Sequence, residues 1–439
     1  MKILLVGSGG REHAIAWKIN QSPKLEKLFI APGNAGTKSI GTNVEISDTD
    51  IEALKNFALA REIDLTIVGP EVPLALGIAD VFVEAGLPIF GPTASAARLE
   101  SSKSFAKTVM EKWNIPTASH KVFQDPEEAN SYLESLNTFP TVLKADGLAA
   151  GKGVYICQHK SEAMSALQDV MVSKVFGDAG TTLIIEEFLE GWELSVFAFT
   201  DGESISDLVG ACDYKRIGEG DAGPNTGGMG AFSPPWIWDQ NLKDQIRDLV
   251  IRPIVEAMRT DYEPFIGTIF AGMMMTAEGP KVVEFNCRLG DPETQAILPL
   301  LGNDILEIFE SCVNGRLNSV NVDWRKDASV AVVLASGGYP SAYTKGYPID
   351  GLVLGRDSVN IFHAGTKLDE EGKIVTNGGR VLAVNALAPD INQAADVGYE
   401  NIFISNSLAL KSSGLSDLAC IPRMTASNSL CPTNSASSP

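Results

Sequence analysis

VVEFNCRLGDPETQ, residues 282–295, begins with an apolar pair typical of a buried strand and ends in a run of acids. Glu284, Asn286 and Arg288 occupy alternate positions, so on an extended chain their side chains share one face. Carboxylate and amide oxygens suit Mg²⁺, which usually also binds substrate phosphates, and a guanidinium can hold a transferring phosphoryl group. The segment therefore predicts a magnesium and phosphate site. The plainer alternative is a strand end with ordinary surface charges.

The composition is that of an acidic, globular chain. Its 439 residues suffice for roughly two to four domains, and apolar and charged fractions of 44% and 21% are typical of globular proteins. The net charge of −20 argues against a nucleic-acid partner. Without an apolar run of about 18 residues or signal-peptide flanks, we expect a cytoplasmic chain that does not span a membrane. Six cysteines without CxxC spacing predict reduced thiols.

The first hundred or so residues repeat a strand–loop–helix pattern, which predicts an open parallel sheet. Strand Lys2–Val6 leads into Gly7-Ser8-Gly9-Gly10 and a helical pattern, an arrangement that can hold an anion at a helix N-terminus. A dinucleotide fingerprint needs glycine where this chain has Glu12, which disfavours a nicotinamide enzyme. We expect ligands at the carboxyl ends of the strands.

A glycine-rich loop joins two predicted strands, Thr141–Lys144 and Val154–Cys157. It lacks the helix-opening GxxxxGK[ST] pattern of a Walker loop. Lys144 at its base and Lys152 within it would allow the loop to fold over phosphates and exclude water. A plain flexible hairpin is the alternative.

The second half of the chain continues with strands and one long loop. Strand Thr182–Glu187 leads into a connector suited to an adenine edge, and the glycine-rich loop Ile217–Phe232 has a length that is usually functional. Gly267–Thr276 is expected to pair with Val282–Phe285, and strands from Ser329 onward predict a small, mostly-β domain that closes over the site.

Together these motifs resemble the glycinamide ribonucleotide synthetase family, also called the phosphoribosylamine–glycine ligases, of the ATP-grasp superfamily. The resemblance covers roughly residues 1–403. The motifs that carry it are GSGGREHA (7–14), GPE (69–71), KADGLAAGKGV (144–154), EEFLEGWELS (186–195), DYKRIGEGDAGPNTGGMGAFSP (213–234) and NCRLGDPETQ (286–295).

The resemblance implies an α/β and α+β multidomain fold: an N-terminal open parallel α/β sheet, a central ATP-grasp fold and a small, mostly-β C-terminal domain. We place the boundaries at 1–103, 104–315 with a lid at about 118–190, and 323–403. Residues 404–439 depart from the family pattern, and their serine-rich composition predicts a disordered tail.

The resemblance also implies the roles of individual residues toward ATP and its metal ion. Glu284 and Asn286 would bind Mg²⁺ or Mn²⁺. The residues that would contact ATP through its phosphates, adenine and ribose are Lys103, Lys144, Gly151, Lys152, Gly153, Glu186, Glu187, Leu189 and Glu193.

Two further residues would be catalytic. Arg288 occupies the place of the arginine that stabilises the acyl phosphate in related ligases, and Asp213 would recognise the glycine ammonium. The residues that would contact the second, sugar-bearing substrate are Gly9, Glu71, Asp291 and Glu293.

The implied reaction is the purine-biosynthetic ligation of glycine to 5-phosphoribosylamine. ATP would convert the glycine carboxylate to glycyl phosphate, and amine attack would give glycinamide ribonucleotide, ADP and phosphate. Positioning and charge neutralisation suffice for such chemistry. The alternatives are another ATP-grasp carboxylate–amine ligase and a catalytically impaired nucleotide-binding homologue. We expect a monomer or dimer.

The assignment of Arg288 generates a first prediction. Arg288→Ala should abolish turnover while largely sparing ATP binding, because the arginine would act on the acyl phosphate. The measurements are ADP release and ATP affinity. A folded variant that no longer binds ATP would contradict the assignment.

Overall fold

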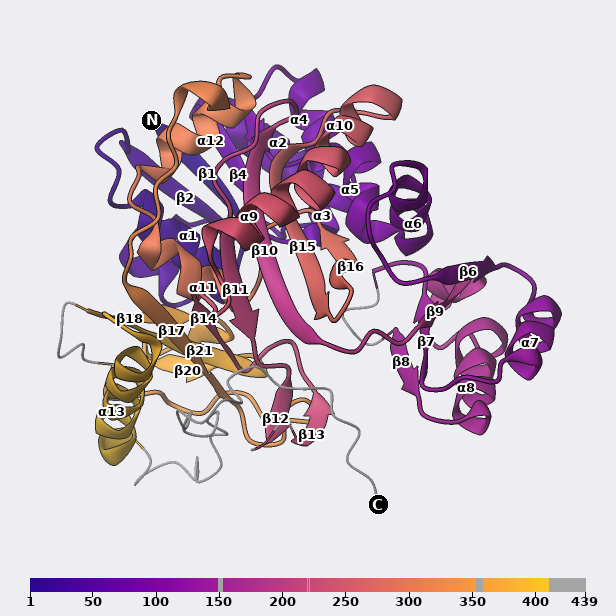
Figure 1. Ribbon diagram of the computed structural model, residues 1–439. Helices are drawn as coiled ribbons and strands as arrows, with labels where there is room; N and C mark the ends of the chain where they lie inside the picture. The colour runs from indigo at the N-terminus through magenta and orange to yellow at the C-terminus, as the bar shows by residue number, and fades with distance from the viewer. Residues whose placement is uncertain (149–152, 219, 221, 353–357, 410–439) are drawn as a thin grey trace.

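The structure, a computed structural model, describes residues 1–148, 153–218, 220, 222–352 and 358–409, with side chains up to residue 402. Figure 1 shows an N-terminal unit in indigo beside a long central sheet, and a lid that projects from both. This arrangement confirms the predicted α/β and α+β multidomain class. The exact domain boundaries remain predictions.

The N-terminal unit is an open sheet in the order β3-β2-β1-β4-β5, and every pair in it is parallel, as predicted. Its strands other than the edge strand β3 are mostly buried apolar runs of the kind that helices cover on both faces. The strands are β1 (Lys2–Gly7), β2 (Lys27–Pro32), β3 (Thr42–Asn43), β4 (Leu65–Val68) and β5 (Ile89–Phe90). The helices are α1 (Gly10–Ile19), α2 (Ile51–Arg61), α3 (Glu71–Ala75), α4 (Ile78–Glu84), α5 (Ala94–Ser101) and α6 (Lys103–Lys112).

The lid is a four-stranded antiparallel sheet in the order β6-β9-β7-β8, with its own apolar core against α7 and α8. The glycine-rich loop joins its strands β7 and β8. The lid elements are β6 (His120–Phe123), α7 (Pro126–Ser135), β7 (Thr141–Ala145), β8 (Val154–Cys157), α8 (Lys160–Leu167) and β9 (Leu183–Glu187).

The central sheet has the order β16-β15-β10-β11-β14-β17-β21-β18. β14 pairs with β17, so the C-terminal strands continue the sheet that carries the ATP-grasp motifs. The predicted pairing of residues 267–276 with 282–285 is present as β15 and β16. The strands are β10 (Trp192–Asp201), β11 (Val209–Asp213), β14 (Gly230–Ser233), β15 (Ile266–Thr276), β16 (Gly279–Asn286), β17 (Ala328–Ala335), β18 (Val359–His363) and β21 (Arg380–Ala388). Two-stranded ribbons complete the described strands: β12 (Arg216–Gly218) with β13 (Ala222–Asn225), and β19 (Thr366–Leu368) with β20 (Ile374–Thr376).

The amphipathic segment after residue 240 is an interrupted helix. α9 (Gln240–Ile246) passes through one π-helical turn, Arg247–Ile251, into α10 (Arg252–Asp261). Pro253 explains the interruption, because proline has no N–H to donate to the preceding turn. Two further helices, α11 (Glu293–Ile297) and α12 (Ile305–Val313), follow the 282–295 segment.

The disorder prediction for residues 404–439 is wrong at its start, because α13 (Ile391–Ala409) extends through residue 409. Ala394, Ala395 and Ile402 are buried on α13, which packs against β21 and β17. Packing of an apolar face supplies most of the stability of such a helix, and the helix then propagates beyond the contact. Residues 410–439 lie outside the described residues. No described helix combines the length and apolar character needed to cross a bilayer.

Phe309 joins the N-terminal unit to the central sheet. The Phe309 side chain is fully buried on α12, stacks on Phe90 of β5 at 4.1 Å between ring centroids, and meets Phe199 of β10 edge-on at 5.9 Å. Phe309→Ala should lower the free energy of unfolding by about 3–5 kcal/mol, because it leaves a cavity between two layers.

Denaturant unfolding measures this effect. Leu76→Ala is the control, because Leu76 is 57% exposed and its truncation should change the free energy of unfolding by less than about 0.5 kcal/mol. Equal losses in the two variants would contradict the proposed junction.

Candidate active site

Four cationic side chains surround Glu284 at the end of β16. Burial raises the pKa of the Glu284 carboxyl, but the charges of Lys103, Lys144, Lys215 and Arg288 outweigh burial and lower the pKa below its ordinary value. Glu284 is therefore ionised at neutral pH.

Asn286 lies two residues beyond Glu284 and is largely buried, and Arg288 Nη2 lies 3.4 Å from Asn286 Oδ1. The structure thus brings together the three side chains that alternate in the sequence. Among the described residues no three or more His, Cys, Asp or Glu side chains gather into a metal site. Glu284 and Asn286 together offer two oxygen donors for a metal ion. This small set fits Mg²⁺, because Mg²⁺ usually completes its coordination shell with water and substrate phosphates.

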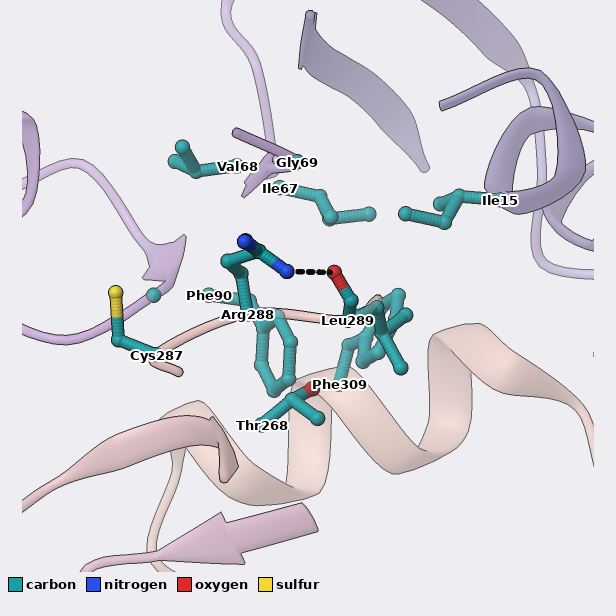
Figure 2. A pocket seen from close by; sticks show the side chains of 11 residues that line it. Ile15, Ile67, Val68, Gly69, Phe90, Thr268, Cys287, Arg288, Leu289 and Phe309 are labelled. Carbon is teal, nitrogen blue, oxygen red and sulfur yellow. Dashed lines mark hydrogen bonds between the residues drawn. The ribbon is translucent and has the colours of Figure 1, made fainter. Parts of the chain in front are cut away.

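Arg288 is held by acids from the N-terminal unit. Its Nε lies 3.1 Å from Glu71 Oε2, and its Nη2 lies 2.9 Å from Glu100 Oε1. Burial lowers the pKa of the guanidinium, but Glu100 and Glu71 outweigh it and raise the pKa, so the charge is permanent. Figure 2 shows the Arg288 side chain hydrogen-bonded to the Leu289 carbonyl. Arg288, Leu289, Thr268 and Phe309 are among the residues that line a cavity of about 10 Å³.

Glu186 carries a buried charge at the base of the lid. Its Oε1 lies 3.1 Å from Lys107 Nζ and its Oε2 lies 2.8 Å from Lys144 Nζ. This carboxylate, one of the groups that the resemblance assigns to ATP, therefore pairs with cations, one from the lid and one from α6. Lys107 was not predicted, although it lies one helical turn after Lys103 on α6, where side chains four apart are neighbours.

The other residues predicted to contact ATP surround the same region. Lys103 Nζ donates to the Gly147 carbonyl at 3.1 Å. Glu187 accepts from the Ser119 N–H at 2.9 Å, and Leu189 is buried beside Met274. Gly153 accepts from the Ala145 N–H at 2.9 Å, which closes the hairpin. Gly151 and Lys152 lie outside the described residues.

A second group of charges lies beside Glu284, around Lys215. Lys215 Nζ lies 3.1 Å from Asp213 Oδ1 and also pairs with Glu193. Ser195 Oγ donates to Glu293 Oε1 at 3.0 Å. Burial, and then the charge of Asp213, raise the pKa of Glu293 from 4.5 to about 7. Burial likewise raises the pKa of Asp213.

A polar cavity of about 280 Å³ lies between the N-terminal unit and the C-terminal strands. Four residues were predicted to contact the sugar-bearing substrate. Gly9 and Asp291 line this cavity, whereas Glu71 pairs with Arg288 and Glu293 lies beside Asp213. Arg380 also lines the cavity, 3.4 Å from Asp291 Oδ1. Burial raises the pKa of Asp291, but Arg380 and Arg11 outweigh it and lower the pKa.

The sequence reasoning missed most of the lining residues. Asn34 follows β2, at the carboxyl edge where ligands were expected, but the partners of Arg380, Asp291 and Gly227, lie 89 and 153 residues away and leave no local signal. The remaining lining residues are Ser8, Gly33, Ala364, Gly365, Thr366 and Asn377.

Comparison with known proteins gives a consistent result. Phosphoribosylglycinamide synthetase domain families match residues 1–100 (N domain), 101–294 (ATP-grasp, or A, domain) and 329–407 (C domain). The chain belongs to the phosphoribosylglycinamide synthetase family. It is an ATP-dependent carbon–nitrogen ligase of purine biosynthesis, as its sequence predicted.

Individual relatives support this membership. The phosphoribosylamine–glycine ligase of Halalkalibacterium halodurans is 49% identical and aligns over 92% of this chain and 93% of that one. The trifunctional purine biosynthetic protein adenosine-3 of Gallus gallus is 48% identical over 95% of this chain, which spans only 42% of that protein. Its further activities are therefore not carried over.

Solved structures agree in fold. The crystal structure of the phosphoribosylamine–glycine ligase of Thermotoga maritima has a TM-score of 0.80 at 32% identity, and the match covers 92% of this chain and 96% of that one. The biotin carboxylase domain of 2-oxoglutarate carboxylase from Hydrogenobacter thermophilus has a TM-score of 0.71 at 16% identity, with 96% and 91% covered. This second likeness shows the ATP-grasp fold alone.

The raised pKa of Glu293 generates a prediction on stability. A folded-state pKa of about 7 against 4.5 means that Glu293 contributes stability below pH 4.5 and loses this contribution as the pH rises through 7. Glu293→Gln should therefore raise the unfolding temperature, relative to the unmodified chain, more at pH 8 than at pH 5.

Thermal unfolding at both pH values measures the difference. Glu52→Gln serves as control, because Glu52 is exposed and pairs only with Lys55 at 2.7 Å among the described contacts. A Glu293→Gln effect that is the same at both pH values would show that the carboxyl titrates normally.

Proposed function

We propose that this chain ligates glycine to 5-phosphoribosylamine in the cytoplasm, with ATP and Mg²⁺ or Mn²⁺, through glycyl phosphate. The supporting observation is that four cations surround Glu284 beside Asn286, in a chain that also carries a buried acidic group at Asp213 and a polar cavity at Asp291. In such a site the cations can bind the negative phosphates, and the oxygen donors can bind a metal ion, close to one another.

ATP would lie between the lid and the central sheet. Lys103 and Lys144 flank Glu284, and Lys144 Nζ also donates to the Val283 carbonyl at 3.2 Å, which fixes it against β16. These cations would neutralise the phosphates under the glycine-rich loop. A metal ion held by Glu284 and Asn286 would add charge neutralisation. Arg288 would hold the phosphoryl group during transfer to the glycine carboxylate.

Glycine would lie against the acids around Lys215. Asp213 offers a buried carboxylate for an ammonium group, and Lys215 offers a cation for the substrate carboxylate. Ionic recognition in a buried site of this kind orients a small zwitterion before reaction. The carboxyl group would then face Arg288.

The phosphoribosylamine would occupy the polar cavity. Arg380 is the cation among the lining residues and would meet the 5-phosphate. The N–H of Gly9, at the start of α1, donates to Glu12 Oε2 at 2.5 Å, so the Glu12 carboxylate already occupies this helix end. The amine would approach Arg288 from this cavity.

Substrate-dependent ADP release tests the proposal. We expect ADP only when glycine and 5-phosphoribosylamine, generated in place, are both present with ATP and Mg²⁺. The likeness to a biotin carboxylase domain makes bicarbonate the informative substitute for glycine. ADP release with bicarbonate, or none with both substrates while ATP still binds, would contradict the proposal.

Asp213 gives a more local prediction. Asp213→Asn should raise the KM for glycine by about tenfold or more, because a charged partner of the ammonium group is lost. The affinity for ATP should stay unchanged. The control is Asp207→Asn, whose carboxylate lies on the surface, 2.9 Å from Lys243. Equal KM values for the two variants would remove Asp213 from the glycine site.

A further inference from the structure

The acids around Arg288 are not equivalent. The Arg288 guanidinium contacts Glu71 through Nε, the Leu289 carbonyl through Nη1, and Glu100 through Nη2. One positive charge thus faces two carboxylates from the N-terminal unit. With the contact of Nη2 to Asn286 Oδ1, these partners take four of the five N–H donors, so a phosphoryl group that binds the guanidinium through two donors must share or replace one of them.

Glu100 is fixed on both of its oxygens. Oε1 lies 2.9 Å from Arg288 Nη2, while Oε2 accepts from the Cys287 N–H at 2.8 Å and from the Cys287 thiol at 3.0 Å. The Glu100 side chain is 7% exposed, at the end of α5. Glu100 therefore holds the guanidinium and the backbone beside it, and removing its partner would leave a buried carboxylate unpaired.

Glu71 is held less tightly. Its side chain is 28% exposed, and its Oε2 contacts Arg288 Nε at 3.1 Å and Arg11 Nη1 at 3.8 Å. Burial raises the pKa of Glu71, but Arg288 and Arg11 outweigh it and lower the pKa. If Glu71 left Arg288, it would keep Arg11 and gain water, so this separation costs less than the separation of Glu100.

We propose that Glu100 is a positioning residue that fixes Arg288 for phosphoryl transfer, and that Glu71 is the partner which the phosphoryl group displaces. This inference deepens the proposed function and rests on its assignment of Arg288. Nothing in the local sequence connects these residues, because Glu100 lies 187 residues before Cys287 in the chain.

The test compares two isosteric changes against the same arginine. The probe is Mg·ADP with aluminium fluoride, a mimic of the transferring phosphoryl group, bound to the full chain and measured by calorimetry. Glu100→Gln should reduce the affinity gained from aluminium fluoride by about tenfold or more, with the affinity for Mg·ADP alone unchanged. Glu71→Gln should keep or increase that gain, because a competitor is lost. Glu52→Gln should match the unmodified chain.

A double-mutant cycle with Arg288 distinguishes positioning of the guanidinium by Glu100 from a purely structural role of Glu100. In an Arg288→Lys background, Glu100→Gln should cost less than about threefold, since Glu100 acts through the guanidinium. The same loss in both backgrounds, no loss from Glu100→Gln, or an equal loss from Glu71→Gln would overturn the inference. If Glu100→Gln does not fold, Glu100→Asp replaces it. We expect Glu100→Asp to lose part of the affinity gained from aluminium fluoride, and an unchanged gain would overturn the inference.

Turnover measured in the same preparations distinguishes a failure of the proposed function from a failure of the proposed role of Glu100. ADP release that depends on glycine reports on the proposed function, whereas the aluminium fluoride series reports on Glu100 whichever acid is the substrate. In an active enzyme, Glu100→Gln should lower kcat and leave the KM for ATP unchanged.

Discussion

The guanidinium of Arg288 is the constraint on which the site depends. A buried charge is tolerated only with close partners, and this one takes its acids, Glu71 and Glu100, from the N-terminal unit while its backbone follows β16 of the central sheet. The same ion pairs therefore hold two layers together and fix the direction of the guanidinium, which we propose holds the phosphoryl group. The aromatic contact between Phe90 and Phe309 joins these layers on their apolar side.

The charge around Glu284 is opposite in sign to the net charge of the chain. The chain carries a net charge of −20, yet Lys103, Lys144, Lys215 and Arg288 surround Glu284. Each of the four also has nearby oxygens, such as the Gly147 carbonyl at Lys103 and Glu186 at Lys144. These oxygens hold the cations in place, so little reorganisation would remain for the reaction at the proposed ATP site.

Local patterns in the sequence predicted much of this structure. The parallel N-terminal sheet, the hairpin at 141–157 and the strand spacing of Glu284, Asn286 and Arg288 are all set by short-range periodicity. The partners that complete the site were not predicted. Glu100 and Arg380 reach their contacts only through tertiary packing. The helix through residue 409 depends on contacts with β21, which the serine-rich composition of the segment does not indicate.

We propose that the charges at the end of β16 position the ATP phosphoryl group for transfer to a glycine carboxylate. Ligation of glycine labelled with ¹⁸O in its carboxylate tests this most directly, with mass analysis of the phosphate released. We expect transfer of one labelled oxygen from glycine to phosphate in each turnover. Unlabelled phosphate, released with normal product formation, would contradict it.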